Sequence, residues 1–147
     1  FFFKQKTAYE IQVWLEFRRV LFRSAGNLRL SLAQYRAMAA FAQFGSDLDK
    51  ATQDQLARGE RMVALLKQGQ YVPLSVEKQV VIIYAGTNGY LDKFPTARVG
   101  AYEKGLFEFI EQKYPKLLED IKTKKAIDDQ IKPVLVKALE EFGASFA

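Results

Sequence analysis

The chain has 147 residues, of which 49% are hydrophobic and 27% charged, as expected for one globular domain that buries its own core. It contains no cysteine and no histidine. Disulfides, thiolate metal sites and catalysis by serine–histidine or cysteine–histidine pairs are therefore excluded within it. No apolar run approaches the roughly 18 to 20 residues that a membrane-spanning helix needs, so we expect no such helix.

The first 24 residues differ from the rest in composition. They hold the only tryptophan, and five basic against two acidic residues give them a net charge of +3 out of the total of +5. Leu21-Phe22-Arg23-Ser24 is what the end of a common sequencing adapter encodes in one frame. We interpret residues 1–24 as a non-native segment, followed by one domain over residues 25–147. The alternative is a natural basic, aromatic extension that binds anionic lipid or a partner. Since most of the basic excess lies here, we expect no nucleic-acid partner.

In the remaining sequence, apolar residues recur at spacings of three and four, which predicts helices. The first predicted helix covers residues 30–43, with Leu32 and Phe41 on one apolar face. The second covers residues 52–67. Within it, Gly59 either costs about 1 kcal/mol relative to alanine or permits a close helix crossing.

The apolar run Val80–Tyr84 fits either a buried strand or a buried helix. Ser75 before it is a good N-cap, and Gly86 and Gly89 after it are natural stops. These flanking residues favour a short buried helix.

Three more helices are predicted toward the C-terminus. Thr96 is expected to cap the fourth helix, and Pro115 to open the fifth, because a proline at the first helical position loses no hydrogen bond. Asp128 is expected to cap the last helix, with Pro133 in or near its first turn; a later position would kink the helix. The sequence therefore predicts one compact all-α domain, a bundle of about six helices.

Three local features are candidates for function, and each also has a structural explanation. The amides of Gln68 and Gln70 can pair with adenine, although Gly69 between them is more simply a helix-ending residue. The turn Ser46-Asp47-Leu48-Asp49 is either solvated or a contact for a basic partner. The cluster Lys122–Lys125 is either a phosphate or lipid contact or a helix end stabilised by its dipole. No glycine-rich phosphate-binding loop is present, so the residues alone predict no self-contained active site.

Several short segments follow one another in an informative order. They are LAQYR (32–36), AFAQFGSDLD (40–49), LLKQGQY (65–71), EKQV (77–80), IYAG (83–86) and GYLD (89–92). This series resembles the C-terminal domain of F-type ATP synthase alpha subunits. The resemblance covers about residues 25–147 and is most specific as far as Asp92.

The resemblance implies a role in a proton-translocating rotary ATP synthase. In that family three alpha and three beta subunits alternate around a central stalk, and catalysis takes place on beta. Alpha binds ATP or ADP with Mg without turning it over. The chain would then be a non-catalytic fragment of alpha, whose phosphate-binding loop and catalytic-site arginine lie upstream of Ala25.

The resemblance also assigns positions and surroundings. Gln68 and Gln70 match the glutamines that approach the adenine of the non-catalytic nucleotide, and Ser46, Asp47, Leu48 and Asp49 match the turn that faces the stalk. The implied partners are the beta subunits and the central-stalk gamma subunit. The implied location is peripheral to the bacterial cell membrane on its cytoplasmic side or to the mitochondrial inner membrane on its matrix side. No metal ligands and no catalytic residues are expected in the chain itself.

Two other hypotheses remain open from the residues alone. One is an independent all-helical protein-interaction module without catalytic activity, which would use the acidic Asp47–Asp49 turn or the Lys122–Lys125 cluster. The other is a membrane-surface protein anchored by residues 1–24.

Overall fold

The computed structural model describes residues 26–42, 48–67, 74–124 and 126–146. In these ranges it contains six α-helices and no strand, which confirms the predicted all-α class. The first helix covers residues 26–42. The others are α2 (Lys50–Leu65), α3 (Val76–Thr87), α4 (Val99–Lys113), α5 (Pro115–Lys124) and α6 (Ile131–Phe146), with a short 3-10 helix η1 (Thr96–Arg98) before α4.

Three of the predicted helix starts are confirmed. Ser75 occupies the N-cap position of α3, and Pro115 is the first residue of α5. The Asp128 carboxylate accepts hydrogen bonds from the backbone N–H groups of Gln130 and Ile131, at 3.1 and 2.8 Å, and so caps α6. Pro133 is the third residue of α6, near the helix start as expected, and follows Lys132, whose N–H donates to the carbonyl of Asp128 at 2.9 Å.

The prediction for Thr96 was wrong. Thr96 begins η1 instead of capping α4, whose N-cap is Arg98. The chain enters α4 through a tighter turn because Pro95, the N-cap of η1, is extended and its carbonyl accepts the N–H of Arg98 at 2.9 Å. A threonine after a proline therefore marked the start of a 3-10 turn.

Boundaries of the first three helices also differ from the prediction. The first helix is already formed at residue 26 instead of starting at residue 30. The helix α2 begins and ends two residues earlier than expected. The helix α3 continues through Gly86, and only Gly89, with φ of 81°, terminates it. Gly86 lies within the helix and lets α2 pack closely against it: a Cβ at this position would be 2.9 Å from the Met62 sulfur and 3.0 Å from a methyl carbon of Leu65.

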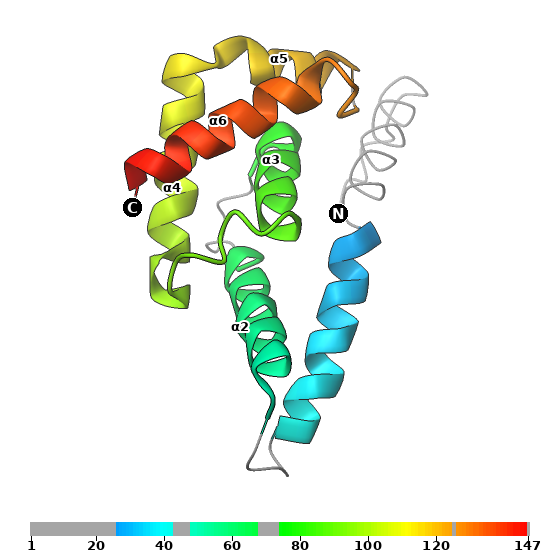
Figure 1. Cartoon of the computed structure of the whole chain (residues 1–147). Coiled ribbons are helices and arrows are strands. Elements are labelled where there is room, and N and C mark those ends of the chain that lie inside the picture. The colour runs from blue at the N-terminus through cyan, green and yellow to red at the C-terminus, as the bar shows by residue number, and fades with distance from the viewer. Residues whose placement is uncertain (1–25, 43–47, 68–73, 125, 147) are drawn as a thin grey trace, which may run out of the picture.

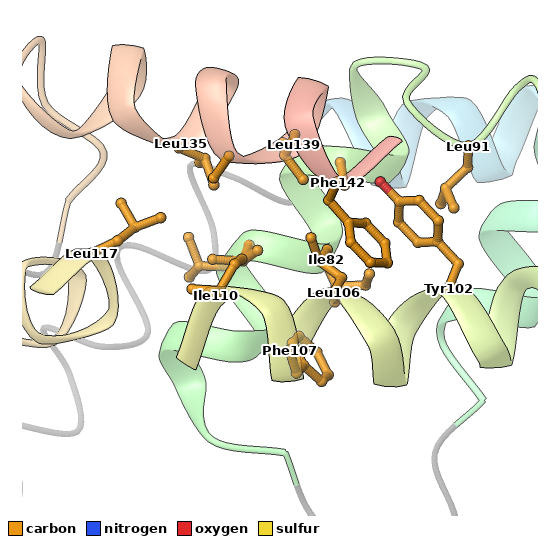
Figure 2. Close-up of a cluster of buried hydrophobic side chains, with 14 of the residues drawn as sticks. Ile82, Leu91, Tyr102, Leu106, Phe107, Ile110, Leu117, Leu135, Leu139 and Phe142 are labelled. Atoms are coloured by element: carbon orange, nitrogen blue, oxygen red, sulfur yellow. The ribbon is translucent and has the colours of Figure 1, made fainter. Parts of the chain in front are cut away.

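The main core lies among α3, α4, α5 and α6 and the upper part of α2 (Figure 1). Val80, Val81 and Ile82 belong to this core, with Val80 and Val81 fully buried, so the preference for a buried helix over a strand is confirmed. Figure 2 shows α4 and α6 facing each other across this core, with Leu106 and Ile110 below Leu135 and Leu139.

Aromatic rings fill the end of the core near the last turn of α6. The ring of Tyr102 packs against those of Phe94, Phe142 and Phe146, with ring centroids 5.0 to 5.3 Å apart. The Tyr102 hydroxyl is buried and has no hydrogen-bond partner among the described residues. Its burial raises the pKa of Tyr102 to about 12.

The helix over residues 26–42 runs beside α2 in the opposite direction (Figure 1). The two helices are close because Gly59 has no side chain: a Cβ there would be 2.3 Å from the ring of Tyr35. Of the two explanations offered for Gly59, the structure supports the close helix crossing. A small second cluster, Leu28, Met62 and Ile83 with Leu32 packed against it, joins this helix to α2 and α3.

Candidate functional site

The predicted site residues fall at the two ends of α2. Gln68 and Gln70 lie outside the described residues, as do Ser46 and Asp47. The structure therefore places only the second half of the predicted stalk-facing turn, which is Leu48 and Asp49.

Leu48 and Asp49 lead into α2, and their polar groups are held by the first turn of that helix. Asp49 occupies the N-cap position, and its carboxylate accepts a hydrogen bond from the Thr52 hydroxyl. This bond lowers the pKa of Asp49 below its ordinary value. The Gln53 side chain donates to the carbonyl of Leu48 at 2.9 Å. Asp49 is thus an exposed carboxylate, ionised at neutral pH, at the end of the helix pair that lies away from the main core (Figure 1).

The surface of the first helix carries a feature that the sequence analysis missed. Leu30 and Phe41 are 61% and 75% exposed, and Ala33 and Ala37 between them are exposed as well. Since a helix turns by about 100° per residue, these four residues form one line along the helix, which we call the outer stripe. The expected burial of Phe41 on the same face as Leu32 was therefore wrong.

The helix has two apolar faces, and this explains the error. Leu28, Leu32 and Tyr35 face α2 and α3, whereas Phe41 is nine residues after Leu32, about half a turn away around the helix. Reading every apolar residue onto one face merged the two lines. The spacing 30, 33, 37, 41 was the available signal, because it repeats every three to four residues by itself.

Positive charge borders the outer stripe. Arg29 and Arg36 are exposed and seven residues apart, so they lie on one flank of it. Within residues 26–42 they are the only charged side chains. Neither forms an ion pair with any described residue.

By contrast, the two arginines of α2 form contacts that stabilise the fold. The guanidinium of Arg58 pairs with the carboxylate of Asp92, with Nε 3.0 and 3.1 Å from its two oxygens. Arg61 donates to the carbonyl of Phe94 at 2.7 Å. These contacts hold the loop after α3 against α2, and Gly89 leaves the space for them.

A hollow of about 530 Å³ lies where α4 ends and α6 begins, across α5. Two of its lysines are already neutralised: Lys113 pairs with Glu141 and Lys124 with Asp128, both at 2.8 Å. The pairing with Lys113 lowers the pKa of Glu141. Lys122 and Lys124 lie in the last turn of α5, and Lys125 lies outside the described residues.

The described residues contain no group of acidic side chains that could hold a metal ion. Among the same residues, no helix is long and apolar enough to cross a membrane.

Comparison with protein families agrees with this architecture. Residues 19–142 match the family model described as ATP synthase alpha/beta chain, C terminal domain. The protein belongs to this family. The ATP synthase C-terminal domain is a part of a larger assembly, so membership implies contact with other ATP synthase subunits. The outer stripe is thus an exposed apolar surface on a domain whose family forms a multi-subunit assembly.

Proposed function

We propose that the protein is an alpha-type C-terminal domain, which contributes to ATP synthesis as a non-catalytic part of the subunit ring around the rotating stalk. The observation that carries the proposal is the LLKQGQY segment at the end of α2 together with the AFAQFGSDLD segment before it. Family membership supports an ATP synthase subunit of either type. The two segments favour alpha, which is the subunit they resemble.

In this proposal each end of α2 has its own role. Asp49, with Ser46 and Asp47, would face the basic or polar surface of the central stalk, since an exposed carboxylate attracts cations at short range. Gln68 and Gln70 would approach the adenine of an ATP or ADP held with Mg by another domain. The domain would be peripheral to the energy-coupling membrane through its partners, which are beta subunits and the gamma subunit.

A pair of chimeras tests the assignment to alpha. In the first, residues 25–147 replace the C-terminal domain of the alpha subunit in a bacterial ATP synthase, and in the second they replace that of beta. We expect the alpha chimera to assemble and to hydrolyse ATP, and the beta chimera to fail. Assembly of the beta chimera alone would overturn the proposal. Failure of both, with each chimeric subunit folded by circular dichroism, would favour the independent interaction module.

The proposal also predicts weak nucleotide binding by the isolated chain. Two amides against a base lack the charge-assisted phosphate contacts that supply much of a nucleotide's affinity. Isothermal calorimetry of the chain with Mg-ATP should show no binding in the low-micromolar range. Tight binding would mean that the chain holds a phosphate site of its own, contrary to the assigned role.

A further inference from the structure

The outer stripe is shaped to receive a helix. Its two ends are large side chains, Leu30 and Phe41, and its middle is formed by Ala33 and Ala37. Small residues allow a partner backbone to come close, while the larger ones at either end fill the grooves beside the partner helix. A contact of this form also explains why so much apolar surface is left exposed on one helix.

The charges beside the stripe restrict the partner further. Arg29 and Arg36 give residues 26–42 a charge of +2 without any acidic residue, and neither arginine is used in an ion pair with the described residues. In an antiparallel pair of two copies, the same flank of each helix would face its counterpart, so the arginines would approach arginines. Like charges across an interface are unfavourable, which argues against an antiparallel pair of two copies.

We propose that the outer stripe docks an amphipathic helix of another subunit, with an apolar face against Leu30 and Phe41 and acidic residues opposite Arg29 and Arg36. The inference rests on the proposed function, because it takes the domain to act inside an assembly. It adds to that function a description of the partner helix, which is apolar on one face and acidic beside it.

Two synthetic amphipathic peptides serve as probes in binding tests on the whole chain. They share one leucine face and differ in carrying glutamate or lysine on the flanks. Each of two surface ion pairs contributes modestly, so at low salt the glutamate peptide should bind roughly tenfold more tightly than the lysine peptide. Added salt should shrink this difference, since exposed charges are screened.

Variants distinguish the contribution of the arginines beside the stripe to peptide binding from that of the protein's overall positive charge. Arg29→Glu with Arg36→Glu should reverse the preference between the peptides. The control, Lys104→Glu with Lys122→Glu, changes the net charge equally at exposed positions on α4 and α5 and should leave the preference in place. Phe41→Ser should weaken binding of both peptides and leave the thermal melting temperature unchanged, because Phe41 is exposed.

Equal binding of the two peptides would overturn the inference, as would an equal effect of the control pair. A stable dimer in analytical ultracentrifugation that Phe41→Glu abolishes would assign the stripe to a second copy and also overturn it. These outcomes are distinct from failure of the proposed function. An alpha chimera that assembles without charge-selective peptide binding would leave the function standing and remove only this partner.

Discussion

Two parts of the molecule bury their apolar residues in different ways: the helix bundle, formed by α3, α4, α5 and α6, and the helix pair, formed by residues 26–42 and α2. In the bundle, α4 and α6 enclose their apolar faces between neighbours, and Leu106, Leu135 and Leu139 are completely buried. The first helix also carries many apolar residues, yet it is covered on one side only, and its second cluster contains just Leu28, Met62 and Ile83. The bundle thus encloses its apolar residues by its own packing, whereas one apolar side of the first helix stays exposed.

The largest expected effect contrasts the two regions directly. Leu139→Ala removes a fully buried side chain from the bundle and should lower the free energy of unfolding by about 2–5 kcal/mol. Leu30→Ala, the same change on the outer stripe, should alter it by less than about 0.5 kcal/mol. Urea denaturation of both variants measures this. Equal losses would show that the first helix is packed as tightly as the bundle.

A smaller effect is expected where the two helices of the pair cross. In Gly59→Ala the new methyl group would overlap the Tyr35 side chain, and forcing the helices apart should cost about 1–3 kcal/mol. Hydrogen exchange should accelerate in residues 26–42 and stay slow in α4 and α6.

The matched control is Gly100→Ala, in a helix with open space around the new methyl group. It should be neutral or stabilise by up to about 1 kcal/mol. Acceleration of exchange throughout the Gly59→Ala molecule would mean that pair and bundle open as one unit.

The loop after α3, which contacts α2 through the Arg58–Asp92 ion pair, should show the next largest loss of stability on substitution. Gly89 has φ of 81° and lies beside Arg58 and Asp92. Gly89→Ala imposes a left-handed backbone on a residue with a side chain, at about 1–2 kcal/mol, and also crowds the ion pair. The melting temperature should fall for Gly89→Ala but not for Gly143→Ala, which faces open space.

The smallest expected effect is a loss of stability at low pH, and it arises from Asp128, which lies in the bundle. The hydrogen bond from Lys124, aided by the backbone N–H of Ile131, holds the pKa of Asp128 below its ordinary 3.8. The folded protein therefore loses this proton more readily than the unfolded one. The stabilisation is complete above the ordinary pKa and disappears as the pH falls through the folded value.

In Asp128→Asn, melting should occur at a slightly lower temperature than in the wild type at neutral pH. The difference should vanish in strong acid. A difference that persists unchanged at low pH would show that the carboxylate charge plays no part.

The sequence predicted the bundle well because its signals are local. Pro115 and Asp128 fix helix starts by their own chemistry, and a run such as Val80–Tyr84 between capping residues has few alternatives. The errors lie at helix ends. Gly86 was expected to stop α3 but lies within it, where it lets α2 pack closely. Thr96 begins a 3-10 helix after Pro95 instead of capping α4.

The candidate site was less predictable from the sequence. The pattern located the turn before α2, and Asp49 is indeed exposed there. It did not reveal the outer stripe, since apolar spacing shows which residues share a face but not whether anything covers that face. Gln68 and Gln70 remain predictions, resting on the resemblance alone.

Ionisation of the buried phenol of Tyr102, followed by ultraviolet absorption, reports on whether the bundle is folded. With its pKa raised to about 12, the folded protein keeps this proton after unfolded tyrosines, at about 10, have begun to lose theirs. The neutral ring favours the folded state fully below the unfolded pKa, and this contribution is lost as the pH rises through the folded value. In alkaline solution, ionisation of Tyr102 should therefore accompany opening of the bundle and come later than that of tyrosines with an ordinary pKa.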